Sequence, residues 1–384
     1  MKILFLDQSG RVGGAELCLL DVAACCRDRS LVALFEDGTF RQLLEDSHIP
    51  VQVLSQTPIS VRKESSWLAG VKSVRQLLPL SARVVRLSRQ YDAIYANTQK
   101  ALVVGAIASF LSRRPLIYHL HDILSLEHFS LTNQRLAVTL ANRAALVIAN
   151  SEASKAAFLE AGGQREKVYV VYNGFQLSQY QENRDRAKSL RFTLGLEGKF
   201  VIGHFSRLSP WKGQHVLLDA LSRCSADVTA IFVGDALFGE QAYVQQLHEQ
   251  VERLELGDRV QFLGFRSDVI PLMQMCDIVT HTSTAAEPFG RVIVEAMLCG
   301  TPVIAAKAGG ALELVEPERT GWLVEPGDPQ MLADAIAGCQ QNHTQANAIA
   351  QYAQSEARRR FDLETINQQS TALLKSKVFS SSYE

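Results

Sequence analysis

The sequence alternates short, continuous runs of apolar and β-branched residues with longer segments of helical periodicity, and it does so in two series. Continuous apolar runs, unlike runs that alternate with polar residues, are typical of parallel strands buried on both faces of a sheet. The first series of predicted strands lies at 2–6, 31–35, 51–54, 93–96, 115–120, 145–149 and 168–172. The second lies at 200–205, 228–233, 260–262, 277–281, 302–305 and 322–324. This repetition predicts an α/β chain with two parallel sheets.

A polar and highly charged segment separates the two series. We expect residues 1–175 to form one Rossmann-like domain, 176–198 a linker, and 199–350 a second Rossmann-like domain. Residues 351–384 are expected to form a C-terminal helix that crosses back to the first domain, and a tail. Ligands of open α/β sheets bind beyond the carboxyl ends of the strands, so functional residues are expected in the loops that follow the predicted strands.

The composition argues against several classes of protein. With 47% hydrophobic and 21% charged residues, the chain resembles globular rather than disordered proteins. Its 39 basic and 40 acidic side chains argue against a nucleic-acid partner. The seven cysteines show no C-x-x-C pair, which suits a reducing, cytoplasmic compartment. The apolar run that ends at Asp7 is too short for a signal peptide, and the apolar run 101–111 is too short to cross a bilayer.

The loop after the first predicted strand is rich in glycine. Gly10, Gly13 and Gly14 would let backbone amides approach an anion at the start of the next helix. Their spacing is not G-x-G-x-x-G, although Glu36 and Asp37 follow the second strand, where nicotinamide enzymes carry a ribose-binding acid. A tight turn without a ligand is the alternative interpretation.

Two histidines and an aspartate end the predicted strand 115–120. Strand alternation places His119 and His121 on one face, with Asp122 directly after them. This pattern favours a functional site over a purely structural pair. We rank a metal ion low here, because the sequence offers no third cluster of ligands.

Two segments of the second predicted domain carry charge directly after strands. Arg207 and Lys212 lie across a Ser-Pro-Trp turn and could converge on a diphosphate, although a solvated loop pair would look the same. Glu287 lies in a loop before a helix that begins near Gly290, and Glu295 lies inside that helix. A helix N-terminus suits a diphosphate, and carboxylates suit sugar hydroxyls.

A third segment, after the predicted strand 302–305, contains Gly309 and Gly310. Adjacent glycines allow the backbone to approach a ligand closely. This segment places a further polar loop at the same edge of the second sheet.

Together and in this order, these segments resemble the retaining GT-B glycosyltransferases often called family 4. The resemblance covers nearly the whole chain. The matching segments are GGAE at 13–16, HD at 121–122, NSEASKAAF at 150–158, VYNGF at 171–175, RLSPWKG at 207–213, VGD at 233–235, FLGF at 262–265, EPFGRVIVEAM at 287–297 and AGGALELV at 308–315. The E-x7-E pattern alone is weak, whereas the full series is specific.

The resemblance implies a nucleotide-sugar donor held mainly by the second domain. The implied site residues are Arg207 and Lys212 for the diphosphate, Glu287 for the hydroxyls of the donor sugar, Phe289 and Gly290 as backbone donors, Glu295 for the ribose, Phe265 and Arg266 beside the base, Gly13 and Gly14 in a loop over the phosphates, and His121 near the donor sugar, with His119 as its alternative. Arg291 departs from the family, which often has an apolar residue there. We expect its side chain to point to solvent, with an anionic donor or acceptor as the alternative.

The reaction implied by the resemblance is transfer of the sugar to a hydroxyl acceptor with retention of anomeric configuration. The family mechanism uses the leaving phosphate as the base, so we assign no protein nucleophile. The loops after the strands contain no Asp-x-Asp, and we expect neither a metal nor a cofactor. Arg207, Lys212 and the helix N-terminus would instead stabilise the departing diphosphate, which Mg²⁺ does in other enzymes.

The acceptor is expected to bind the first domain and to be a glycan, a lipid-linked sugar or a small molecule. Residues 62–89 carry seven basic side chains against Glu64 alone, interleaved with apolar residues. Such a stretch is typical of a face that lies on an anionic membrane, here the inner face, and equally of a packed helix pair with a solvated basic side. Both interpretations stay open.

Other functions remain as alternatives. A second GT-B activity, a phosphorylase or a nucleotide-sugar epimerase, would suit the same fold, but we find no acid and base for epimerisation. A sugar-nucleotide sensor without activity would not need His121 or Arg207, yet both are present. A nicotinamide oxidoreductase is the most distant alternative.

Overall fold

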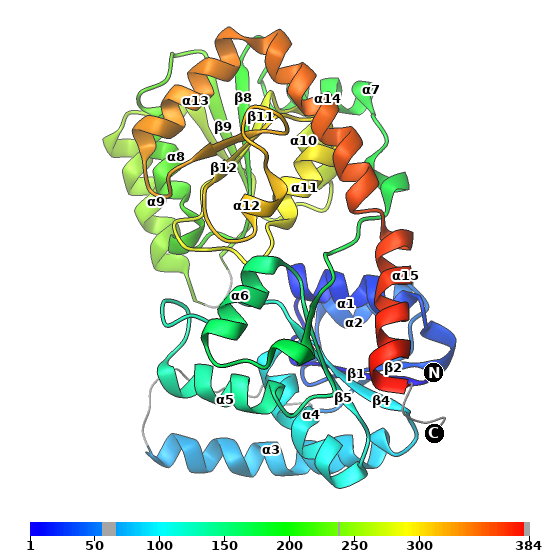
Figure 1. Cartoon of the computed structure of the whole chain (residues 1–384). Coiled ribbons are helices and arrows are strands. Elements are labelled where there is room, and N and C mark those ends of the chain that lie inside the picture. The colour runs from blue at the N-terminus through cyan, green and yellow to red at the C-terminus, as the bar shows by residue number, and fades with distance from the viewer. Residues whose placement is uncertain (56–66, 237–238, 380–384) are drawn as a thin grey trace. The chain divides into compact units, whose positions relative to one another are not determined.

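A computed structural model describes residues 1–55, 67–236 and 239–379, with the side chains of 67–77 left out. The chain forms two compact units (Figure 1). The first unit consists of Met1–Gly174 and Leu363–Glu384, and the second of Phe175–Asp362.

The first unit is built on a seven-stranded parallel sheet in the order β3-β2-β1-β4-β5-β6-β7. Its strands are β1 Ile3–Asp7, β2 Leu31–Leu34, β3 Val51–Val53, β4 Ala93–Ala96, β5 Leu116–Leu120, β6 Leu146–Ala149 and β7 Val168–Val170. Its helices are α1 Gly14–Ala24, η1 Arg27–Arg29, α2 Thr39–Asp46, α3 Trp67–Ser88, α4 Gln99–Ser112, α5 Leu131–Ala141, α6 Glu152–Glu160, η2 Arg165–Lys167, α15 Leu363–Leu374 and η6 Lys375–Phe379.

The second unit is built on a six-stranded parallel sheet in the order β10-β9-β8-β11-β12-β13. Its strands are β8 Phe200–Phe205, β9 Val228–Val233, β10 Val260–Phe262, β11 Ile278–His281, β12 Val303–Ala306 and β13 Trp322–Val324. Its helices are η3 Leu177–Tyr180, α7 Arg184–Thr193, η4 Pro210–Lys212, α8 Gln214–Leu221, α9 Gln241–Arg253, η5 Gly257–Arg259, α10 Val269–Met275, α11 Arg291–Leu298, α12 Ala311–Leu314, α13 Pro329–Gln341 and α14 His343–Arg360.

Both faces of the first sheet are covered, as the continuous apolar runs predict. In β1, Ile3 and Phe5 pack in one core with Leu19 of α1, whereas Leu4 and Leu6 belong to a second core on the opposite face. Burying a side chain of this size contributes about 1.5–3 kcal/mol. The expectation of two parallel α/β sheets is therefore confirmed, and every predicted strand overlaps an observed one.

Residues 176–198, which we expected to be a linker, contain η3 and α7 and belong to the second unit. Arg191 of α7 donates to Asp277, with 2.5 Å between the Nη2 and Oδ2 atoms. This charge-assisted bond explains why so polar a segment is ordered against the sheet. The last helix, α15, belongs to the first unit, where Ile366 and Leu374 are buried.

The basic stretch 62–89 lies partly outside the described residues, since 62–66 are not described and the remainder lies largely in α3. In the part of α3 whose side chains are described, Leu80 and Val84 are buried in the core and Leu78 is 63% exposed. Among the described residues, no helix is long and apolar enough to span a membrane. The membrane interpretation stays a prediction.

Candidate active site

The loops that follow the strands of the second sheet are tied together by backbone hydrogen bonds. On one side of β8, the Gly234 amide donates to the Gly264 carbonyl at 2.8 Å, and the Leu208 amide donates to the Asp235 carbonyl at 3.1 Å. These bonds connect the loops after β8, β9 and β10. They give a rigid backbone to the sheet edge where the sequence places its candidate residues.

The loops after β8, β11 and β12 are connected in the same way. The Thr284 amide donates to the Trp211 carbonyl at 2.8 Å, and the Gly310 amide donates to the Glu287 carbonyl at 2.8 Å. The segments that the sequence analysis singled out around Lys212, Glu287 and Gly310 therefore lie together at one edge of the sheet.

The Glu287 carboxylate is the centre of a buried polar cluster. Its Oε1 lies 2.5 Å from Lys212 Nζ. Its Oε2 accepts from Ser283 Oγ at 2.9 Å and contacts His281 Nε2. A carboxylate has two oxygens with about four lone-pair sites, so these three partners leave room for one more donor.

The ionisation of Glu287 follows from these partners. Burial alone would raise the pKa of the Glu287 carboxyl, but the charges of Lys212 and His281 and their hydrogen bonds hold that pKa well below its usual range. The carboxylate is therefore ionised, and it can act only as a hydrogen-bond acceptor. Lys212 Nζ also lies 4.1 Å from the centre of the Trp211 ring, which fixes the ammonium further.

Arg207 interacts with a different carboxylate from the one that contacts Lys212. Its Nε is 3.3 Å from Glu240 Oε2, and Glu240 Oε1 accepts from Ser209 Oγ at 2.6 Å. The two predicted cations thus come from the loop and short helix after β8, and each has an acidic partner. A lysine ammonium has three donors, so it can keep a carboxylate and still bind an anion.

Phe289 and Gly290 connect the cluster to helix α11. The Phe289 side chain is 2% exposed and packs against Phe175 and Phe361, so only its backbone is available to a ligand. Gly290 is the residue before the first turn of α11, and its φ of +96° is a left-handed conformation that favours glycine.

The expectation that Arg291 points to solvent is wrong. Its side chain is 16% exposed, its guanidinium lies 4.5 Å from the centre of the Phe175 ring, and its Nε is 3.5 Å from Glu295 Oε1. An aromatic face and a carboxylate one turn away outcompete water for this planar cation. Glu295, expected to bind the ribose, thus already has a cationic neighbour.

The predicted base-contact residues lie in the loop after the edge strand β10. Phe265 is 76% exposed, and Arg266 forms a bidentate pair with Asp268 at 2.8 and 2.7 Å. This pair holds the loop in place, while the exposed Phe265 ring and the neighbouring backbone remain accessible to a flat ligand.

Gly309 and Gly310 make room for protein backbone. A Cβ atom on Gly309 would lie 2.2 Å from the Glu287 carbonyl oxygen, and one on Gly310 would lie 2.5 Å from the Phe289 carbonyl oxygen. The two glycines therefore do allow a close approach of the backbone, but the partner is the loop that contains Glu287 and not a ligand. The glycines place that loop, and through it the Glu287 carboxylate.

In the first unit, three neighbouring strands deliver a chain of hydrogen bonds that ends at His121. Asp7 ends β1, Asn97 follows β4 and His121 follows β5. Asn97 Nδ2 donates to Asp7 Oδ2 at 2.7 Å and to the Ala15 carbonyl at 3.1 Å, and Asn97 Oδ1 lies 2.8 Å from His121 Nε2. Because both amide protons are used, Nε2 must be the donor, and the lone pair of a neutral His121 lies on Nδ1.

His119 is buried beneath His121 and is not interchangeable with it. Its Nδ1 lies 2.7 Å from the Tyr95 hydroxyl, and the residue is only 3% exposed. Burial, helped by the charge of His121, holds the pKa of His119 well below its usual range, so the ring is neutral. His121 is partly exposed and is the better candidate for contact with a ligand.

The glycine loop of the first unit has two parts. Gly10 is structural, because a Cβ atom there would lie 2.2 Å from the Asp37 carbonyl oxygen. Gly13 and Gly14 begin α1 without a side-chain cap. The Glu16 carboxyl lies against Gly13, and burial together with Asp7 raises its pKa to about 8. A protonated Glu16 leaves this helix start without a negative charge at neutral pH.

Sequence reasoning missed several residues of these clusters. His281, Ser283 and Glu240 surround the predicted charges of the second unit, and Asn97 orients His121. A signal was available for Asn97 and His281, since one follows a strand and the other ends one. Cys18, which lies against the two histidines, had no such signal because it comes from a helix.

Two family models match the chain and together cover most of it. Residues 12–179 match the model described as Glycosyltransferase Family 4, and residues 186–356 match the model described as Glycosyl transferases group 1. The chain therefore belongs to the group 1, family 4 glycosyltransferases, and its two Rossmann-like units are those of the GT-B fold.

Individual relatives fit this family. The crystal structure of Anabaena Alr3699/HepE in complex with UDP-glucose is 59% identical, with a TM-score of 0.92 over 98% of this chain and 100% of that one. Spore coat protein SA of Bacillus subtilis is 31% identical over 51% of this chain. D-inositol 3-phosphate glycosyltransferase of Corynebacterium urealyticum is 31% identical over 57% of this chain. These alignments span only 55% and 54% of the two curated relatives.

Proposed function

We propose that this protein transfers glucose, or a closely related sugar, from a UDP-sugar to a hydroxyl of a glycan, a lipid-linked sugar or a small-molecule acceptor. The observation that supports the donor is the 59% identity to Alr3699/HepE, whose structure contains UDP-glucose. Related structures of that protein hold UDP, or UDP and glucose, at 60% identity to this chain. The Lys212–Glu287 cluster supplies the chemistry such a donor needs.

In this proposal, Glu287 accepts a hydrogen bond from a hydroxyl of the donor sugar while Lys212 binds the diphosphate. Both roles suit the contacts, because Glu287 retains one acceptor position and Lys212 retains donors after pairing. Arg207 adds a second cation in exchange for its contact with Glu240. Fixed positive groups stabilise the charge that develops on a departing diphosphate, so we propose retaining transfer without a metal.

A panel of donors tests this function. We expect UDP-glucose to bind at least about tenfold more tightly than ADP-glucose or GDP-mannose, as measured by calorimetry, and slow UDP release from UDP-glucose to persist in EDTA. An isomerised UDP-sugar without acceptor would instead indicate an epimerase. Formation of a sugar phosphate that requires inorganic phosphate would indicate a phosphorylase. Either product, or the absence of UDP-sugar binding, would contradict the proposal.

We also propose that the first unit lies on an anionic membrane surface. Helices α3 and α4 pack together and carry exposed apolar side chains, with Leu78 63%, Phe110 84% and Leu111 56% exposed. Arg86 lies on α3, Arg113 directly follows α4, and both residues are exposed. Apolar side chains beside cations are typical of interfacial surfaces.

The membrane proposal is tested by sedimentation with vesicles of phosphatidylcholine, with and without phosphatidylglycerol. We expect binding only to the anionic vesicles, and Phe110→Asp to weaken it at least about tenfold, since burying one phenylalanine contributes about 1.5–3 kcal/mol. The matched control is Phe192→Asp in α7, where the side chain is 71% exposed. Equal sedimentation of both variants, or none of the wild type, would contradict the proposal.

A further inference from the structure

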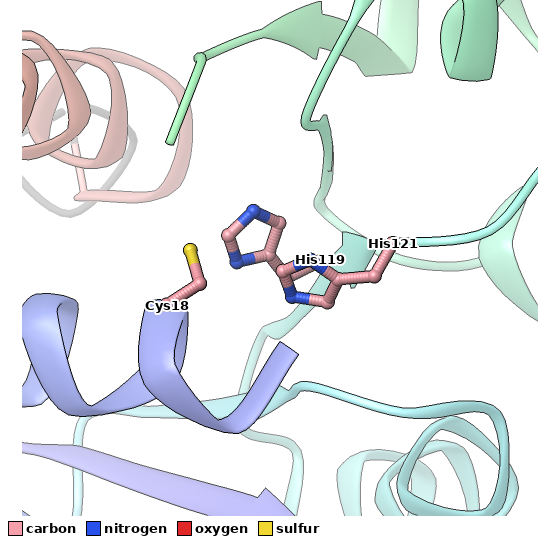
Figure 2. A group of neighbouring side chains, drawn as sticks. All are labelled: Cys18, His119 and His121. Atoms are coloured by element: carbon pink, nitrogen blue, oxygen red, sulfur yellow. The ribbon is translucent and has the colours of Figure 1, made fainter. Parts of the chain in front are cut away.

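Cys18 of α1 and the two histidines at the end of β5 form a compact group of potential metal ligands. One ligand atom of each side chain lies within 4.8 Å of those of the other two. Figure 2 shows the thiol of Cys18 and the two imidazole rings gathered at one place. The ring centres of His119 and His121 are 3.9 Å apart. Nothing in the retaining transfer proposed above uses Cys18.

The hydrogen bonds around the group fix the tautomer of His121 and hold the ring of His119, which can bind a cation through Nε2 when its Nδ1–H donates to the Tyr95 hydroxyl. Asn97 fixes the proton of His121 on Nε2, so its Nδ1 carries the lone pair. His119 is bonded through Nδ1 to the Tyr95 hydroxyl, and among the described residues its buried Nε2 has no hydrogen-bond partner. Metal-binding histidines usually have their second nitrogen held by a partner in this way.

We propose that Cys18, His119 and His121 form an inhibitory binding site for Zn²⁺. One thiolate and two imidazoles match the borderline-soft character of zinc, and three protein ligands leave a fourth tetrahedral position for water. Mg²⁺ prefers oxygen ligands and does not suit this set. The ligand atoms now lie within 4.8 Å of one another and must close to roughly 3.5 Å around zinc.

Zinc binding would release one proton and would inhibit transfer by occupying His121. The ion forms one Zn–S and two Zn–N bonds, loses waters of hydration, and releases the thiol proton of Cys18 to solvent. His121 is the partly exposed member of the group, so the ion reaches the site from its side. Zinc then occupies the nitrogen lone pair of His121. The inhibitory part rests on the proposed function, and on the family resemblance, which implies that His121 lies near the donor sugar.

The experiment uses the full chain, stripped of metals with a chelator. Zinc affinity is measured by competition with a chromophoric chelator, and Co²⁺ serves as a spectroscopic probe. We expect one ion per chain, a thiolate-to-Co²⁺ charge-transfer band in the near ultraviolet, and at least about 100-fold weaker zinc binding in Cys18→Ala. The matched control is Cys25→Ala/Cys26→Ala, which removes two other thiols near the end of α1 and should keep the band.

Activity provides a second, separate readout. Each variant is compared with its own zinc-free rate. We expect zinc to raise the KM for UDP-glucose in the wild type and the double control, and to have at least about tenfold less effect in Cys18→Ala. Zinc binding that depends on Cys18 in a protein without turnover would refute the proposed function but not the site. Equal zinc affinity in Cys18→Ala and wild type, or no thiolate band, would refute the site.

Discussion

Replacing Glu287 with alanine should abolish sugar transfer. The carboxylate is ionised and buried, and it retains one acceptor position beside Lys212, His281 and Ser283. Loss of a charged acceptor from a preorganised site costs at least about 100-fold in kcat. UDP release from UDP-glucose measures the rate. Glu249→Ala is the matched control, because this glutamate is exposed on α9 of the same unit. Normal turnover in Glu287→Ala would refute the assignment.

Binding measurements separate this role from a loss of folding. If Glu287 binds sugar hydroxyls, Glu287→Ala should weaken the binding of UDP-glucose by about tenfold or more relative to the binding of UDP. The reason is that a hydrogen bond to a charged group contributes about 1.5–3 kcal/mol. The single variant also leaves Lys212 buried without its partner, which costs about 3–5 kcal/mol. The double variant Lys212→Met/Glu287→Met should regain much of that stability in urea unfolding and remain inactive.

The fold could be predicted because its signal is local. Strands such as β8 and β9 are continuous runs rich in apolar and β-branched residues, and burial on both faces of a sheet requires that composition wherever the chain places them. The polar segment 176–198 carries no such signal. Its order depends on Arg191 meeting Asp277, a residue distant in the sequence. Periodicity cannot reveal a contact of that kind.

The candidate site also has a part that the sequence could predict and a part that depends on distant contacts. Lys212 and Glu287 could be placed at one sheet edge, because parallel strands bring their carboxyl ends together. The partner of each charge could not be predicted. Arg291 was expected in solvent because most charges are solvated, yet the distant Phe175 lies beneath its guanidinium. Cys18 was not grouped with His119 and His121 because a helix and a strand deliver them separately.

Gly213→Ala should destabilise the second unit more than Gly198→Ala does. Gly213 follows Lys212 with a φ of +71°, and an added Cβ atom would lie 1.9 Å from the Thr282 carbonyl oxygen. Gly198 is a matched control, since its φ is +70° and nothing lies within 4 Å of its added Cβ atom. A left-handed alanine costs about 1–2 kcal/mol, and forced overpacking adds about 1–3 kcal/mol.

Urea unfolding followed by circular dichroism measures the difference between the two alanine variants. Gly198→Ala should show only the cost of the left-handed backbone, and Gly213→Ala should lower the unfolding free energy by about 2 kcal/mol more. Thr282 Oγ1 donates to the carbonyls of Lys212 and Gly213, at 3.0 and 2.9 Å, and accepts from His204 Nε2 at 3.0 Å. A displaced turn should therefore also carry Lys212 away from Glu287. Transfer should therefore fall in Gly213→Ala under conditions where it remains folded, and stay normal in Gly198→Ala. Equal stability and equal rates in the two variants would mean that the close packing of Gly213 on the β11 loop does not position Lys212.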